Sequence, residues 1–126
     1  MTTVAAGLVC GLLGVLAVFQ VLLAFGAPLG RFAWGGRHRV LPTSLRLGSA
    51  VSVAVYAFLA AVVLVRADLL AAGVPDAVVR TAAWVVVGYF FIATGMNLAS
   101  RSKSERAVMV PTVAVLCGLC AVVAAG

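Results

Sequence analysis

The chain has 126 residues, of which 65% are hydrophobic and only 10% are charged, and its mean hydropathy is +1.25. A water-soluble domain carries about 25% charged residues, so too few polar side chains are present to cover a globule in water. Nine basic residues outnumber three acidic ones, but they lie in short gaps between apolar runs, without a basic helix or zinc-ligand spacing. Composition therefore excludes a soluble domain and a nucleic-acid-binding protein, and it predicts a membrane protein.

Four apolar stretches are long enough to cross a bilayer, which takes about 20 predominantly apolar residues. They are residues 4–25, 47–65, 77–98 and 107–125. A backbone in lipid must satisfy its own hydrogen bonds, so each stretch is expected to be a helix. The predicted fold is an all-α membrane protein, a bundle of four transmembrane helices forming one domain over residues 1–126.

The basic residues are distributed unequally between the loops. The first loop (26–46) and the third loop (99–106) together carry seven of them, whereas the second loop carries Arg66 and Arg80, offset by two aspartates. The positive-inside rule then places the first and third loops in the cytoplasm and both termini outside. Eight of the nine basic residues are arginine in an Ala-, Val- and Gly-rich chain, a composition that suggests a GC-rich bacterial genome, and the expected location is the bacterial cytoplasmic membrane.

Polar side chains recur at three- and four-residue spacing on one face of the second helix and one face of the third. The members are Arg46, Ser49, Ser52 or Val53, Tyr56 and Ala60 on the second helix, and Phe90, Thr94, Asn97 and Arg101 on the third. Polar groups inside a membrane point away from lipid and towards partners. The two stripes are therefore expected to face each other or a shared cavity, either as hydrogen bonds between helices or as a path for a ligand or ion.

The first helix carries Gly7, Gly11 and Gly14 on one face, and Gln20 points nearly the opposite way. Small residues allow a neighbouring backbone to approach closely, so this glycine face is a helix-packing surface. Two interpretations remain open, namely a homodimer through the glycine face and internal packing against the fourth helix.

The first loop is too apolar for a free loop and too rich in Gly and Pro for a regular helix. Its aromatic residues Phe32 and Trp34 suit the headgroup layer of a membrane, and its arginines suit phosphate. It is expected either to lie on the membrane surface or to form a re-entrant, lid-like segment at the mouth of the bundle. His38, the only histidine, is interpreted as an exposed loop residue rather than a ligand.

Two acidic residues mark helix starts. Asp76 follows Pro75 and is a natural N-cap for the third helix. Ser102 and Glu105 have the S-x-x-E spacing of a capping box, which is expected to start the fourth helix.

Cys117 and Cys120 form the only redox-type spacing in the chain. Four helices with C-x-x-C in the last one resemble the quinone-linked disulfide enzymes of the vitamin K epoxide reductase class, which implies a thiol/quinone oxidoreductase. Those enzymes also use a loop cysteine pair, and this chain has only Cys10 besides. Cys117 and Cys120 lie in the apolar second half of their helix, where a reactive thiolate is disfavoured, and packing is the expected role.

A second resemblance rests on the motifs GAPLG, WGG and LP in the first loop and N-x-x-SRS-x-x-ER in the third. This combination is similar to small four-helix integral membrane proteins of bacteria, and it implies fold and location without an activity. The two halves also share short motifs, Gly-Ala-Pro-Leu-Gly-Arg with Gly-Met-Asn-Leu-Ala-Ser-Arg, which fits two parallel hairpin repeats related by an axis along the membrane normal.

The sequence predicts that the protein binds or transports a small anionic or lipid-like ligand near the cytoplasmic side. The expected ligand-binding residues are Arg46, Tyr56, Asn97, Arg101, Trp34 and Arg37. The alternatives are an accessory subunit of a larger membrane complex and the oxidoreductase named above. No paired carboxylates, HExxH or phosphate loop occurs, so no catalytic residue, metal or cofactor is predicted. The expected partners are the bilayer, anionic lipid headgroups and a second copy or a membrane partner.

Overall fold

The computed structural model describes all 126 residues, and four long helices account for most of them. Each helix has 23 or 24 residues, which gives a length of about 35 Å at about 1.5 Å per residue. All four are long and apolar enough to cross a membrane, and no strand is present, as the sequence predicts. Their bounds are α1 Thr2–Ala24, α2 Thr43–Arg66, α3 Asp76–Leu98 and α4 Lys103–Ala125.

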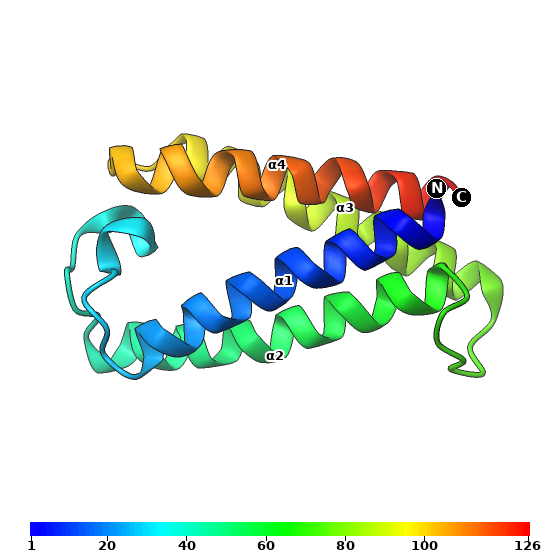
Figure 1. Cartoon of the computed structure of the whole chain (residues 1–126), viewed down its shortest axis with the longest axis horizontal. Helices are drawn as coiled ribbons and strands as arrows, with labels where there is room; N and C mark the ends of the chain where they lie inside the picture. Colours follow the sequence, from blue (N-terminus) through cyan, green and yellow to red (C-terminus); the bar gives the residue numbers. More distant parts are fainter.

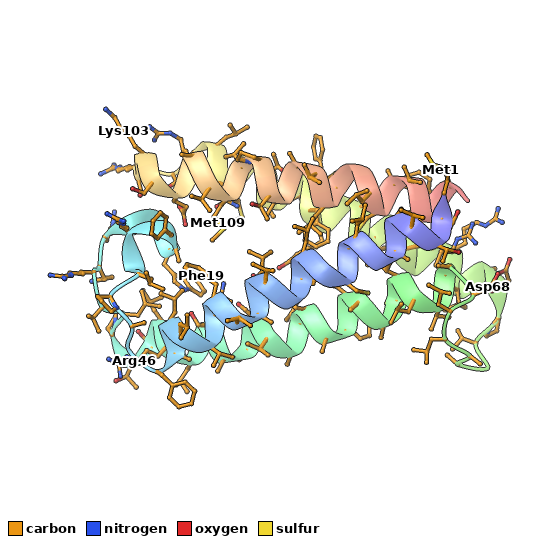
Figure 2. The ribbon with its side chains drawn as sticks, viewed as in Figure 1. Met1, Phe19, Arg46, Asp68, Lys103 and Met109 are labelled. Carbon is orange, nitrogen blue, oxygen red and sulfur yellow. The ribbon has the colours of Figure 1, made fainter.

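Consecutive helices run antiparallel and form two hairpins, α1 with α2 and α3 with α4, which pack into one bundle (Figure 1). Both termini and the loop between α2 and α3 lie at one end, here called the terminal end. The loops that follow α1 and α3 lie at the other end. Figure 1 shows α1 crossing α4 at the terminal end and diverging from it towards the other, so that second end is called the wide end. Figure 2 places Arg46 and Lys103 at the wide end and Asp68 at the terminal end.

The core is an apolar cluster to which all four helices contribute. Its fourteen buried residues are Ala5, Ala6, Val9, Leu13 and Leu16 from α1, Leu59 and Val63 from α2, Val86 and Phe90 from α3, and Met109, Val113, Leu116, Cys120 and Val123 from α4. The members on α1 recur every three or four residues, as one face of a helix requires. The cluster occupies the bundle between its ends, and the buried polar residues Gln20, Ser49, Ser100 and Glu105 are not among its members.

The glycine face of α1 points away from this core. Gly7, Gly11 and Gly14 are exposed, and a methyl group added at any of them meets no heavy atom within 4 Å. Internal packing of these glycines against the fourth helix, one of the two interpretations of the sequence, is therefore wrong. The face is free for lipid or for another helix, while Gln20 on the opposite side is buried.

Loop 1, residues 25–42 between α1 and α2, folds over the wide end of the bundle (Figure 1). It contains two short 3-10 turns, Gly30–Phe32 and Trp34–Gly36. Its residues Ala33 and Leu41 are buried in a small cluster with Leu23 of α1. The loop thus buries part of itself against the bundle, while residues 37–40 are exposed, and its position relative to the membrane surface stays a prediction.

The two predicted helix starts are formed only in part. Pro75, and not Asp76, is the N-cap of α3, and no side chain caps this helix. Asp76 is instead the first helical residue, where a carboxylate still interacts favourably with the helix dipole. Ser102 caps α4 as predicted, because its Oγ accepts a hydrogen bond from the Glu105 backbone N–H at 3.2 Å.

Candidate ligand-binding site

An open cavity of about 770 Å³ lies at the wide end, beneath loop 1 and against α3. One wall is formed by Leu45 of α2 with Trp34, Gly35, Arg37 and His38 of loop 1, and the other by Tyr89, Ile92, Ala93, Met96 and Asn97 of α3. Residues Ala99–Arg101 of the loop before α4, together with Glu105 of α4, complete the lining. This space is called the outer cavity, and its volume is that of a site for a small molecule.

The outer cavity combines a basic rim with an apolar wall. Arg37, His38 and Arg101 lie at its loop side and are exposed. Ile92 and Met96 of α3 present apolar surface below them and are also exposed on the outside of the bundle. Arginine is well suited to a phosphate or carboxylate group, and the apolar wall to a hydrocarbon chain. The arrangement matches an amphiphile with an anionic head.

A second space, the inner cavity, has a volume of about 190 Å³ and lies between the four helices and loop 1. Gln20 of α1 and Tyr56 of α2 meet there, with the Gln20 Nε2 donating to the Tyr56 hydroxyl at 3.3 Å. The other amide atom, Oε1, is buried without a hydrogen-bond partner. Leu16, Phe90 and Val113 of the core also line this cavity.

The two polar stripes meet at the inner cavity and not through hydrogen bonds to one another. On α3, Thr94 donates to the Phe90 carbonyl at 2.8 Å and Asn97 donates to the Ala93 carbonyl at 2.8 Å, each one turn back on the same helix. The cavity is lined by Ser52 and Tyr56 from α2 and by Phe90 and Asn97 from α3. A shared cavity, one of the arrangements that the sequence suggests, is thus what the structure contains.

Trp34 lines both cavities. Its indole N–H donates to the Oγ of Ser49, which is fully buried at 0% exposure. The ring lies so close to Gly48 that a methyl group there would be 2.9 Å from the indole. Trp34 also has a positive φ of 53°, a conformation that costs a bulky residue about 1–3 kcal/mol. The contacts on α2 hold the indole in place despite this cost.

Glu105 is the functional residue that the sequence did not indicate. In a complete capping box its carboxylate would return to the Ser102 backbone N–H, but that N–H donates to Ser100 Oγ at 3.1 Å. The Glu105 side chain is only 7% exposed and lines both cavities. No side-chain hydrogen bond engages its carboxylate. The S-x-x-E spacing therefore explains the hydrogen bond of the Glu105 backbone N–H but not the position of the Glu105 carboxylate.

The structure brings together most of the predicted ligand-binding residues. Trp34, Arg37, Asn97 and Arg101 line the outer cavity, and Tyr56 lines the inner cavity with Trp34 and Asn97. Arg46 lines neither cavity.

The side chain of Arg46 contacts loop 1 instead of a cavity. Its Nε donates to the carbonyl of Leu41 at 2.9 Å, and its guanidinium lies against Gly26, where an added methyl group would be 2.8 Å from the Arg46 Nη2. Arg46 therefore joins the start of the loop to its end. The helical spacing of the polar residues does not predict this contact, because the acceptor, the Leu41 carbonyl, belongs to loop 1 and not to a helix.

The cysteines form no disulfide. Cys120 is 1% exposed and belongs to the core, and the Cys117 thiol contacts the Val87 carbonyl at 3.6 Å. Both lie in the second half of α4, towards the terminal end and away from the two cavities.

No protein family, no curated protein and no solved structure matches the chain. The functional argument therefore rests on the residues and on the geometry of the two cavities.

Proposed function

We propose that the protein binds an amphiphilic ligand with an anionic head at the outer cavity. The observation that carries the proposal is the combination of Arg37, His38 and Arg101 with the apolar surface of Ile92 and Met96 around one space of about 770 Å³. The arginines hold the head through charge-assisted hydrogen bonds, and the hydrocarbon part lies along α3. A carrier protein and a sensor protein must both bind their ligand, so the proposal holds for either class of protein.

The proposed setting is the cytoplasmic membrane of a bacterium, with the wide end in the cytoplasm. Seven of the nine basic residues lie in or next to the loops of the wide end, and short loops rich in Arg and Lys remain on the cytoplasmic side. The ligand then enters from the cytoplasmic surface, where anionic headgroups also attract the basic rim.

Fluorescence of Trp34 offers a direct test, because this indole lines the cavity. Trp84 on α3 is the only other tryptophan and is exposed on the outside of the bundle, so Trp84→Phe leaves Trp34 as the single reporter. We expect anionic dihexanoyl phosphatidylglycerol to change its emission at lower concentration than uncharged dihexanoylglycerol does.

The basic rim is tested with a double variant that combines Arg37→Gln and Arg101→Gln. Arg80→Gln, which removes an arginine at the terminal end, is the control. The double variant should weaken binding of the anionic lipid by about twofold or more, because exposed charge pairs contribute about 0.2–1 kcal/mol each. Arg80→Gln should leave binding unchanged. Equal affinity for the charged and uncharged lipids, unaffected by the double variant, would contradict the proposed function.

The second candidate is an accessory subunit or homodimer, and the exposed glycine face favours it. Gly7, Gly11 and Gly14 form a smooth strip that nothing in the chain covers, and such strips are common where two transmembrane helices meet. Both functions are compatible, since the glycine face and the outer cavity lie on different helices.

A further inference from the structure

An unpaired acid within an otherwise basic site requires an explanation. Glu105 is the only acidic residue in the lining of either cavity, and it is 7% exposed. Burying a charged carboxylate is costly unless a partner compensates it. A ligand with only negative charge would be repelled by Glu105. The ligand must therefore bring something that this carboxylate attracts.

The groups around Glu105 are short of donors. The Gln20 Oε1 is unpartnered, and the Gln20 side chain is 8% exposed. Gln20, Tyr56 and Asn97 line the inner cavity together with Glu105. A carboxylate only accepts hydrogen bonds, so the Glu105 carboxylate and the Gln20 Oε1 are both acceptors without a hydrogen-bond donor. The carboxylate is not among the sealed, unpaired atoms of the bundle, which leaves it accessible from the cavities.

We propose that Glu105 binds a primary ammonium group, so that the ligand has a zwitterionic head with an ammonium close to its phosphate. This inference rests on the proposed function, because the phosphate is held by Arg37 and Arg101 at the basic rim. A primary ammonium has three N–H donors. Glu105 accepts one of them, and the Tyr56 hydroxyl, which lines the inner cavity beside it, is the acceptor for another.

The position and size of the site fit this group. Glu105 lines both cavities, so a head held in the outer cavity reaches it. The inner cavity of about 190 Å³ corresponds to roughly six water molecules at about 30 Å³ each, enough for an aminoethyl group. The same chemistry occurs in an aminophospholipid headgroup and in a free aminoalkyl phosphate.

The experiment compares three short-chain lipids on the full chain carrying Trp84→Phe, with Trp34 fluorescence as the signal. Dihexanoyl phosphatidylethanolamine has a primary ammonium, dihexanoyl phosphatidylcholine has a quaternary one without N–H donors, and dihexanoyl phosphatidylglycerol has none. We expect phosphatidylethanolamine to bind at least about tenfold tighter than the other two, equivalent to about 1.4 kcal/mol. Free phosphoethanolamine is titrated in parallel. If phosphoethanolamine binds as tightly as dihexanoyl phosphatidylethanolamine does, the ligand is a soluble aminoalkyl phosphate. If it binds more weakly, the ligand is an aminophospholipid.

Glu105→Gln should remove this preference while leaving phosphatidylglycerol affinity unchanged or higher. The amide keeps the shape of the side chain, and the backbone N–H still donates to Ser102. Asp76→Asn is the matched control, since it removes a first-turn acid from α3 at the opposite end and should change nothing. Where Glu105→Gln fails to fold, stepwise N-methylation of phosphatidylethanolamine tests the same point on the Trp84→Phe protein, and affinity should fall with each N–H removed.

The outcomes separate this inference from the function on which it rests. Equal binding of phosphatidylethanolamine, phosphatidylcholine and phosphatidylglycerol, with Glu105→Gln neutral and the Arg37/Arg101 double variant weakened, overturns the ammonium site and leaves the anion site in place. Failure of all three lipids to affect Trp34 overturns both.

Discussion

Asn97 and Arg46 lie at the same end of the bundle, but their hydrogen bonds differ in kind. Asn97 donates to the carbonyl of Ala93 on its own helix, and this bond joins no second element. Arg46 donates to Leu41 of loop 1, so its bond holds the loop on α2. Asn97 also lines both cavities. The first residue is therefore expected to affect binding and the second to affect stability.

Asn97→Leu should lower the free energy of unfolding by about 0.6 kcal/mol, the average for side-chain hydrogen bonds in membranes, while weakening lipid binding at Trp34. Arg46→Gln should cost about 1.5–3 kcal/mol because it removes a charged donor from a buried carbonyl, and it should leave the affinity of the stable fraction unchanged. Thermal unfolding in detergent and the fluorescence titration measure the two quantities. Small, equal losses of stability with unaltered binding in both variants would exclude the cavity as the site.

At the scale of the single element, loop 1 depends on two adjacent glycines with different surroundings. Gly35 and Gly36 have φ values of 79° and 72°, so alanine at either position costs about 1–2 kcal/mol of backbone strain. A methyl group at Gly35 meets nothing within 4 Å, whereas at Gly36 it would collide with the Ser102 Cβ. The two positions therefore differ in space and not in backbone conformation.

Gly36→Ala should release loop 1 from the start of α4, and Gly35→Ala should not. The expected signs are a shift of Trp34 emission and faster labelling of a cysteine placed at His38 in the Gly36→Ala protein. Gly35→Ala controls for the backbone strain. If the two variants behave alike, the contact between Gly36 and Ser102 does not hold the loop.

The glycine face of α1 yields a second prediction at this scale. Gly11→Leu introduces a side chain where the protomer has open space, so we expect the thermal unfolding of the protomer to be unchanged. The same side chain should weaken self-association by keeping the neighbouring backbone away. Förster transfer between labelled copies in lipid vesicles measures this, with Val85→Leu, exposed on α3, as the control. Undiminished transfer in Gly11→Leu would place the contact between copies elsewhere.

The sequence predicts the elements better than the contacts between them. The four helices follow from length and hydropathy, because lipid leaves a backbone no alternative. The helix-period stripes correctly bring Tyr56 and Asn97 to a common space. They misplace Arg46, because a periodic pattern contains no information about the Leu41 carbonyl of a folded loop.

Two features of the site required the tertiary structure. Trp34 binds Ser49 on α2 through a left-handed backbone that no residue preference suggests. Glu105 reaches the cavities because Ser100 takes the backbone donor that a capping box would use. In both cases the position of the side chain depends on which hydrogen-bond partner the folded chain supplies, and the spacing of residues in the sequence does not show that partner.

At the scale of the whole molecule, the charges at the two ends predict one orientation. The wide end contains seven basic residues and the terminal end two, so the wide end should remain in the cytoplasm. In a protein with Cys10, Cys117 and Cys120 replaced by alanine, a cysteine at Thr3 should react with an impermeant maleimide in intact cells. A cysteine at His38 should react only after the cells are opened. The reverse pattern would place the basic rim on the outer surface and contradict entry of the ligand from the cytoplasm.

The divergence of α1 and α4 towards the wide end makes loop 1 a spacer between the two hairpins. Figure 1 shows the loop in the space that the diverging helices leave. Ser102 at the start of α4 donates to the Arg31 carbonyl on one side of the loop, and Arg46 of α2 donates to the Leu41 carbonyl on the other. The opening angle between α1 and α4 and the shape of the loop are therefore expected to change together.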